Sequence, residues 1–427
     1  MEVNKIHQLF LSCFSVSTDT RKIIPNSMFF CLKGDKFDAN TFAKEALEKG
    51  AAFVIIDDSD YYINEQTILV EDTLITLQEL AQFHRLFLKL PIIALTGSNG
   101  KTTTKELINA VLSNKYKVKA TIGNLNNHIG VPLTLLSFDK TTEIGIVEMG
   151  ANHQKEIEFL CEIAKPDFGY ITNFGKAHLE GFGGVEGVIK GKSEMFRYLK
   201  DNNKVVFINL DDEIQVQKSE SISQYSFSIK NKTANVLIDE TNANPFVSVK
   251  YNGLEIQSHL VGIYNATNIN AAILIGHYFK VTDDEIKKAI ENYNPTNNRS
   301  QLSIKGSNHL ILDAYNANPS SMTVALKNLT ELHQANKIAF LGDMFELGEE
   351  SYEEHKAILE LIENKPEIEF YFIGKEFYKT KIIRPNFHFL GTFEELKTEL
   401  SEKKLENNYI LIKGSRGMAL ERIVELL

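Results

Sequence analysis

The segment Thr96-Gly-Ser-Asn-Gly-Lys-Thr-Thr-Thr104 constrains this chain more than any other feature. It follows the apolar run Pro91–Leu95, which is typical of a buried strand, and it leads into a helical pattern over Lys101–Leu112. A glycine-rich turn between strand and helix lets backbone N–H groups and the helix N-terminus converge on phosphate oxygens. The segment therefore predicts a phosphate-binding loop. It is a shortened one, because Leu95 stands where the general pattern has a glycine.

Four residues fit a nucleotide site in and around this loop. In the loop, Lys101 is expected to reach the terminal phosphates and the Thr102 hydroxyl to ligate Mg²⁺. Glu148 ends an apolar strand, and a carboxylate in that place suits a metal ion better than it suits an apolar core. His178 follows another apolar strand, at the edge where α/β folds bind ligands. The plainer alternatives are a turn without a ligand, an exposed strand-end glutamate and an ordinary histidine.

Length and composition bound the class of protein. With 427 residues the chain exceeds one ordinary core, and its 43% hydrophobic and 24% charged residues are typical of a soluble globular protein. The net charge of −10 argues against a general nucleic-acid binder. No apolar run approaches the roughly 20 residues that span a bilayer, and no secretory signal is visible. The three cysteines, Cys13, Cys31 and Cys161, show no metal-type spacing, so we expect a cytoplasmic setting.

The alternation of apolar and helical segments predicts an α/β protein of three units, covering residues 1–88, 89–295 and 296–427. Strands that alternate with helices favour a mostly parallel sheet covered on both faces. The strand-rich, polar stretch 221–260 predicts an antiparallel insertion, and the turn-rich Asn292–Asn298 is the expected linker. The main expected strands are Met28–Leu32, Phe53–Ile56, Thr67–Val70, Lys117–Thr121, Ile144–Glu148, Phe168–Asn173, Val205–Ile208, Leu310–Asp313, Lys337–Leu341, Ile368–Ile373 and Tyr409–Lys413.

Taken together, the motifs resemble the Mur ligases of peptidoglycan synthesis along nearly the whole chain. Two motifs near the C-terminal end, Tyr315-Asn-Ala-Asn-Pro319 and Leu341-Gly-Asp-Met-Phe-Glu-Leu-Gly348, look like the branch of this family that adds a dipeptide. The other motifs that carry the resemblance are Thr96 to Thr103, Gly123-Asn-Leu-Asn-Asn-His-Ile-Gly-Val-Pro132, Glu148-Met-Gly150, Asn173 to Gly181 and Lys413-Gly-Ser-Arg-Gly417.

The resemblance implies three domains: one for a UDP-sugar, a central P-loop ATPase with a mostly parallel sheet, and a C-terminal Rossmann-like domain. It also implies the reaction. The γ-phosphate of ATP passes to the terminal carboxylate of UDP-N-acetylmuramoyl-tripeptide, giving an acyl phosphate. The free amine of D-alanyl-D-alanine then attacks, and phosphate leaves. The charge that develops needs metal ions and cationic donors. A monomer that closes its domains around the substrates is the default expectation.

Matching residues carry the implied roles. The catalytic set is Lys101, His178 and Lys192, and the implied cofactors are ATP, two Mg²⁺ ions and a carbamylated lysine. Lys192, in Gly191-Lys-Ser-Glu-Met-Phe196, is favoured for the carbamate, with Lys190 as its rival. Nucleotide-binding residues are Gly97, Asn99, Gly100, Lys101, Thr102, Thr103, Asn268 (base), Arg299 (phosphates) and Asp313 (ribose). Metal ligands are Thr102, Glu148, His178 and carbamylated Lys192, and substrate residues are Thr20, Arg21, Asn124, Asn126, Asn127, Asn316, Asn318, Lys413, Ser415 and Arg416.

Two positions depart from the family pattern, and two competing functions remain open. Tyr264 stands where relatives usually have histidine, and His128 stands where an acidic residue is frequent, so neither receives a role. The first competing function is a sibling ligase that adds one amino acid, or a folylpolyglutamate synthase. The Asp-Asn-Pro-Arg motif of the diaminopimelate-adding enzymes is not found in the chain. The second is a non-catalytic nucleotide-binding protein, which the retained lysines, glutamate and histidine disfavour.

Overall fold

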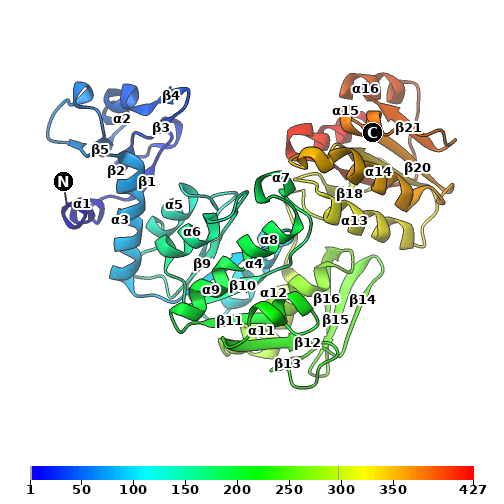
Figure 1. Ribbon diagram of the computed structural model, residues 1–427, viewed down its shortest axis with the longest axis horizontal. Helices are drawn as coiled ribbons and strands as arrows, with labels where there is room; N and C mark the ends of the chain where they lie inside the picture. Colours follow the sequence, from blue (N-terminus) through cyan, green and yellow to red (C-terminus); the bar gives the residue numbers. More distant parts are fainter. Residues whose placement is uncertain (1, 297) are drawn as a thin grey trace.

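The computed structural model describes residues 2–296 and 298–427, so Asn297 of the expected linker lies outside the described residues. Three α/β units follow one another along the chain and form an arc (Figure 1). The N-terminal unit, in blue, and the C-terminal unit, in yellow to red, lie at opposite ends of the central unit, in cyan to green. The predicted boundary at 88 falls between a helix and a strand, and the one at 295 falls in the segment between the second and third units.

The N-terminal unit is built on a parallel sheet of order β1-β2-β5-β6, with a small antiparallel hairpin of β3 and β4 beside it. Asp72 caps α3 by accepting from the N–H of Ile75, and this long helix carries the chain to the central unit. The strands are β1 Ser15–Ser17, β2 Ser27–Phe30, β3 Lys33–Gly34, β4 Phe37–Asp38, β5 Ala51–Ile56 and β6 Thr67–Leu69, and the α-helices are α1 Val3–Phe10, α2 Ala43–Glu48 and α3 Thr73–Leu88.

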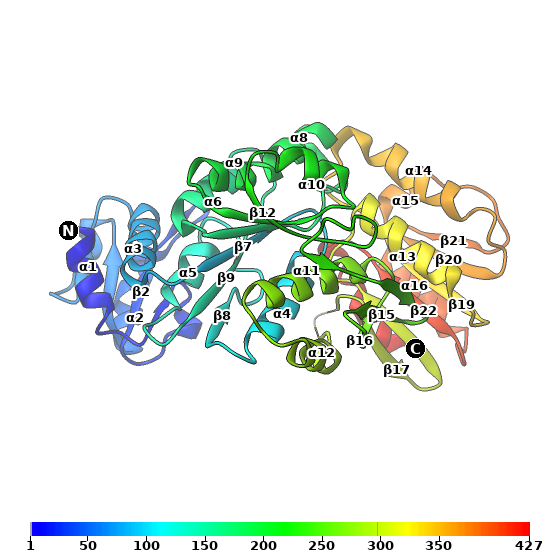
Figure 2. The same ribbon diagram turned by 90° about the horizontal axis from the view of Figure 1, so that it is seen from below.

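The central unit contains a fully parallel seven-stranded sheet of order β13-β12-β11-β10-β7-β9-β8. Its helices lie on both sides of the sheet (Figure 2). The strands are β7 Ile92–Thr96, β8 Val118–Ala120, β9 Ile144–Glu148, β10 Phe168–Ile171, β11 Val205–Asn209, β12 Ser223–Ser228 and β13 Val236–Leu237; the α-helices are α4 Lys101–Leu112, α5 Gly130–Leu136, α6 Glu156–Ala164, α7 Leu179–Phe182, α8 Val185–Lys192, α9 Glu194–Asp201, α10 Glu213–Lys218, α11 Asn265–Tyr278 and α12 Asp283–Asn292.

The interior strand β7 shows why this sheet is covered on both faces. Its side chains alternate between two separate apolar cores: Ile92 and Ala94 belong to one, and Ile93 and Leu95 belong to the other. All four are fully buried. A strand that is apolar on both faces needs helices on both sides, which confirms the predicted α/β fold with a mostly parallel sheet.

The stretch 221–260 differs in part from the prediction of an antiparallel insertion. Its first two strands, β12 and β13, instead extend the main parallel sheet. Only the three later strands are antiparallel, in a sheet of order β14-β15-β16 formed by Glu240–Ala243, Phe246–Tyr251 and Leu254–Val261. The error arose because polar residues such as Ser223 and Gln224 lie near the edge of the parallel sheet, where strands are only partly covered.

The C-terminal unit is a six-stranded sheet of order β17-β18-β22-β19-β20-β21, in which only β17 runs antiparallel. No helix in the described ranges 2–296 and 298–427 is long and apolar enough to cross a membrane. The strands of this unit are β17 Gln301–Lys305, β18 Asn308–Asp313, β19 Lys337–Gly342, β20 Ile368–Ile373, β21 Phe387–Leu390 and β22 Tyr409–Lys413, and the α-helices are α13 Pro319–Glu331, α14 Ser351–Ile362, α15 Lys375–Lys379 and α16 Phe393–Ser401.

Two buried histidines join the first helix to the central unit. His7 on α1 is 3% exposed, and its Nε2 lies 3.0 Å from Nδ1 of His84 on α3. Nε2 of His84 lies 2.9 Å from the carbonyl oxygen of Phe138. This oxygen can only accept, so His84 carries its proton on Nε2 and accepts from His7 on Nδ1. Burial lowers the pKa of His7 to about 4, aided by the charge of His84, and burial also lowers the pKa of His84.

Acid is expected to weaken this junction. Because the folded pKa of His7 lies below its unfolded value, the stability from the neutral ring is complete above about pH 6.5 and is lost as the pH falls toward 4. Lowering the pH from 7.5 to 5 should reduce the free energy of unfolding by about 2 kcal/mol through His7 alone. Urea titrations at both pH values measure the change. A His7→Gln variant, which keeps an amide donor but does not titrate, should depend less on pH; equal dependence would contradict this assignment.

Candidate functional site

A cavity of about 810 Å³ lies where the central and C-terminal units meet. It is large enough for a nucleotide or a similar ligand, since ligand sites commonly measure about 300–1,000 Å³. Residues from both units line it. Among the predicted site residues these are Asn99, Gly100, Lys101, Thr102, Thr103, Asn124, Asn126, Asn127, Glu148, His178, Asn268, Arg299, Asp313, Asn316, Asn318 and Lys413.

The conformation of the phosphate loop is fixed by the backbone of Gly97 and by contacts with the residues that follow β10. Gly97 has φ +142°, and a Cβ atom there would lie 2.0 Å from Oγ1 of Thr172. The Thr172 hydroxyl donates to the carbonyl oxygen of Asn99 at 2.6 Å, and the N–H of Ser98 donates to the carbonyl oxygen of Asn173 at 3.1 Å. The loop therefore needs glycine for this close approach, and it is fixed before any ligand arrives.

Lys101 begins α4, with its ammonium group folded over the loop. Its Nζ donates to the carbonyl oxygen of Gly97 at 2.6 Å. Burial lowers the pKa of Lys101 to about 8; Glu148 acts in the opposite direction, and Arg299 adds to the lowering. The ammonium group is thus enclosed by the loop and by the cavity wall. A bound anion would return its pKa toward the usual value.

Glu148 is a buried carboxylate in which one oxygen accepts a hydrogen bond and the other accepts none. The residue is 2% exposed at the end of β9, and its Oε1 accepts from Nδ2 of Asn126 at 2.8 Å. Its Oε2 lies 3.8 Å from Nζ of Lys105 and has no hydrogen-bond partner. A buried carboxylate oxygen without a donor is unfavourable unless a cation fills the place. The oxygen-rich lining here, with the Thr102 hydroxyl, therefore fits a magnesium ion.

Protein ligands alone do not complete a metal centre. Within residues 2–296 and 298–427, no three histidine, cysteine, aspartate or glutamate side chains are grouped closely enough to hold an ion. Such a site is typical of Mg²⁺, which usually keeps several waters and binds one or two carboxylates together with substrate phosphates. The metal ligands named from the sequence are thus compatible with a site that the nucleotide completes.

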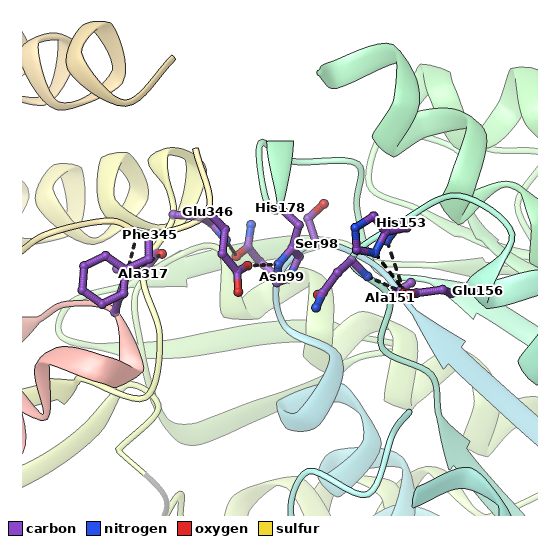
Figure 3. Close-up of polar contacts among 12 residues, drawn as sticks. Ser98, Asn99, Ala151, His153, Glu156, His178, Ala317, Phe345 and Glu346 are labelled. Carbon is purple, nitrogen blue, oxygen red and sulfur yellow. Dashed lines mark hydrogen bonds and ion pairs between the residues drawn. The ribbon is translucent and has the colours of Figure 1, made fainter. Parts of the chain in front are cut away.

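His178 lies on the rim of the cavity and pairs with Glu346 of the C-terminal unit (Figure 3). Both residues have a left-handed backbone, with φ of 54° and 62°. This conformation costs a non-glycine residue of the order of 1 kcal/mol or more and is frequent at functional sites. The hydrogen bond from His178 lowers the pKa of Glu346. The predicted catalytic histidine is thus oriented by a residue 168 positions further along the chain.

The phosphate loop also contacts the C-terminal unit directly. Nδ2 of Asn318, the N-cap residue of α13, donates to Oδ1 of Asn99 at 2.8 Å. Close by, the N–H of Lys176 donates to the Ser320 hydroxyl at 2.8 Å. The position of the C-terminal unit is therefore tied to the conformation of the loop.

Lys192 is one of the largest fully buried side chains of the protein, at 1% exposed. Its Nζ donates to the carbonyl oxygen of Ala151 at 3.3 Å and lies 4.9 Å from the centre of the Phe182 ring. Burial lowers the pKa of Lys192 well below its usual value, and the nearby Lys101 acts in the same direction. Lys190, its rival for the carbamate, is exposed. The burial of Lys192 and its lowered pKa thus favour it over Lys190 as the candidate for the carbamate.

Several residues named for the nucleotide are already engaged within the protein. Oδ1 of Asn268 accepts from the Thr104 hydroxyl at 3.0 Å, and its Nδ2 donates to Asn265 at 2.8 Å, so this side chain braces α4 against α11. Asp313 forms a 2.6 Å ion pair with the buried Lys413. The direct contacts of Asn268 with a base and of Asp313 with a ribose stay predictions.

The remaining predicted residues lie at or beyond the edge of the cavity. Arg21 is an exposed residue of the N-terminal unit and forms a bidentate pair with Asp19, and Thr20 precedes it in the same short turn. The Ser415 hydroxyl is buried and accepts from the N–H of Phe345, and Arg416 pairs with Glu421. None of these four, nor Gly97 or Lys192, is among the residues that line the cavity.

Sequence reasoning assigned no role to several polar cavity residues at the ends of strands. Thr172 and Asn173 follow β10 and brace the loop, Asn209 ends β11, and Asp212 lies shortly after it. The sequence contained a signal for these residues, because polar residues at the carboxyl end of a parallel strand lie at the ligand-binding edge of such a sheet. Glu346 offered no comparable signal, since its contact depends on how two units meet.

Comparison with known proteins agrees with this geometry. Residues 95–276 match the Mur ligase middle domain, and residues 298–416 match the Mur ligase, glutamate ligase domain. These are the two units that enclose the cavity. The chain belongs to the Mur ligase family, whose members are ATP-dependent ligases.

Within this family, similarity extends over the whole chain for one kind of enzyme. The UDP-N-acetylmuramoyl-tripeptide–D-alanyl-D-alanine ligase of Bacillus subtilis is 35% identical, over 96% of this chain and 92% of that protein. The Escherichia coli enzyme of the same name is 32% identical, over 97% and 93%. MurF from Acinetobacter baumannii, a solved structure, has a TM-score of 0.87 at 27% identity and covers 99% of this chain and 98% of its own. MurF from Thermotoga maritima in complex with ADP has a TM-score of 0.85 at 26% identity, over 98% and 97%.

Proposed function

We propose that this protein joins D-alanyl-D-alanine to the terminal carboxylate of UDP-N-acetylmuramoyl-tripeptide, with conversion of ATP to ADP and phosphate, in peptidoglycan precursor synthesis. The observation that carries this proposal is the two-unit cavity, which combines a preformed phosphate loop with a buried Glu148 whose Oε2 accepts no hydrogen bond. The full-length relatives bear the name of this reaction. The structural similarity to MurF from Acinetobacter baumannii over 99% of this chain supports the same assignment.

The charges of the side chains around the cavity indicate a different role for each of them. The loop N–H groups, Lys101 and Arg299 provide the positive side of the cavity and would bind the triphosphate. Mg²⁺, held by Thr102 and Glu148, would neutralise charge on the transferred phosphoryl group. The pairing with Glu346 holds the His178 ring at the rim, between the two units. The contacts of Asn99 and Lys176 with α13 favour a closed arrangement, which excludes water from an acyl phosphate.

Activation of Lys192 by CO₂ is a further part of the proposal. A buried, neutral amine attacks the carbon of CO₂; the N–C bond forms, one amine proton leaves to solvent, and a carbamate anion remains. This converts a buried cation-forming group into an oxygen ligand, which would serve the second of two Mg²⁺ ions. The support is the burial of Lys192, its lowered pKa and its single backbone acceptor, Ala151.

Removal of CO₂ should therefore inactivate the enzyme. Degassed protein in bicarbonate-free buffer is expected to lose most of its ligase activity and to regain it on addition of bicarbonate. Labelled bicarbonate should give a carbamate carbon signal that is absent from Lys192→Arg and present in Lys190→Arg, the matched control on the same helix. Crystallographic density that ends at Nζ of Lys192 would contradict the carbamate.

The decisive test of the overall function is coupled phosphate release with all three substrates, omitting one at a time. Release should require UDP-N-acetylmuramoyl-tripeptide, ATP and D-alanyl-D-alanine together. Single amino acids in place of the dipeptide separate the proposed reaction from that of a sibling ligase. Activity with a single amino acid but none with the dipeptide would overturn the choice. Sedimentation of the active protein tests the further expectation of a monomer, and fractionation of cells tests that of a cytoplasmic location.

A further inference from the structure

The connection between the central and C-terminal units has an unusual backbone. Asn298 and Ser300 both have left-handed conformations, with φ of 54° and 51°. Arg299 lies between them and lines the cavity. Such conformations are uncommon for residues other than glycine and persist where surrounding contacts impose them. The contacts that hold Ser300 therefore also determine where the Arg299 side chain points.

Ser300 is held from two units. Its Oγ lies 2.6 Å from the Tyr264 hydroxyl at the start of α11, so one of these hydroxyls donates to the other. Its N–H donates to Oδ1 of Asp313 in β18 at 3.3 Å. The Tyr264 ring in turn lies against Gly262, where a Cβ atom would be 2.3 Å from the ring. Ser300 itself is 5% exposed, so water does not replace these bonds easily.

These contacts fix the position of the Arg299 side chain before any ligand binds. The Arg299 guanidinium stacks over the Tyr315 ring, 3.6 Å from its centre. Its Nε is buried and has no hydrogen-bond partner, although the residue lines the same cavity as Lys101. An unmet buried donor is costly, and an anionic ligand in the cavity would satisfy it.

We propose that the hydroxyl pair of Tyr264 and Ser300 is a strut that aims Arg299 at the phosphates of the nucleotide. Tyr264, which also lines the cavity, is then a positioning residue that acts through Arg299. This inference rests on the proposed function, because it takes the anion to be Mg·ATP. It also assigns a role to a tyrosine that the sequence left without one.

The test is a double-mutant cycle on nucleotide affinity. Tyr264→Phe removes one hydroxyl and keeps the ring, and Ser300→Ala removes the other. Each is expected to raise the dissociation constant of Mg·ATP about fivefold, the usual value of one hydrogen bond. The double variant should bind Mg·ATP no more weakly than either single variant, because both substitutions remove the same hydrogen bond. In an Arg299→Ala background, Tyr264→Phe should have no further effect, because the group that it positions is gone.

Tyr251→Phe is the matched control. Its hydroxyl donates to Oδ1 of Asp283 at 3.0 Å, away from the residues that line the cavity, so its loss should lower the melting temperature but leave nucleotide affinity unchanged. The strut is overturned if Tyr264→Phe binds Mg·ATP as the wild type does, or if it weakens binding equally without Arg299. Failure of the wild type itself to bind Mg·ATP would instead refute the proposed function.

Discussion

Replacing Lys101 with methionine is expected to lower the rate of phosphate release about 10³-fold at saturating substrates, since the lost cation serves the transferred phosphoryl group. Methionine has a similar length and fills the same space without charge. The Lys101 ammonium donates to Gly97 within the same loop, so the fold should survive the removal of this group. Initial rates in the coupled phosphate assay measure the first effect, and circular dichroism melting measures the second.

Lys115→Met provides the control for this substitution. Lys115 follows the same helix at its far end, and its Nζ also donates to backbone carbonyl oxygens, those of Phe279 and Lys280. It does not line the cavity. The variant should retain wild-type turnover with a small change in stability. Equal turnover in both variants would show that Lys101 has no special place in the reaction.

Glu148→Gln should have an effect of similar size for a different reason. The amide oxygen of glutamine can still accept from Asn126, so packing is preserved. The charge on the free side, where Oε2 has no donor, is removed. Turnover should fall about 10³-fold, in proportion to the lost electrostatic stabilisation. The dependence of the residual rate on Mg²⁺ concentration should shift to higher concentrations, which a titration with the metal measures.

Glu194→Gln separates this effect from the general cost of altering a buried carboxylate. Glu194 is also 2% exposed, but both of its oxygens accept backbone N–H groups, those of Lys155 and Glu158. Its replacement should cost about 1–3 kcal/mol of stability with little change in the Mg²⁺ requirement. If both variants lost activity in parallel with stability, Glu148 would be a structural residue and not a metal ligand.

Local patterns predicted much of the fold. The strand Ile144–Glu148 and the helix Lys101–Leu112 agree to the residue with β9 and α4, because continuous burial and a clear period identify both. The prediction failed at β12, a polar strand that pairs in parallel with β11. It also missed β17 and α5, since short or exposed elements depend on their neighbours in space more than on their own composition.

The site residues, like the fold, were predicted where the signal is local and missed where it depends on contacts between units. Sequence placed Lys101 and Glu148 because a loop motif and a strand end are local features. It could not place the pairing of His178 with Glu346, nor the 2.8 Å contact of Asn99 with Asn318, because both form only where separate units meet. In the N-terminal unit, the predicted substrate residue Arg21 pairs with its neighbour Asp19.

The contact between Asn99 and Asn318 has a pharmacological consequence. The two amides come from different units, so the phosphate loop and the C-terminal unit, here called the lid, meet at a seam that includes this pair. A small molecule bound in that seam would keep the two units apart. It would keep the lid ajar and inhibit the enzyme without imitating either the nucleotide or the dipeptide, and escape mutations would be expected to arise on both sides of the seam.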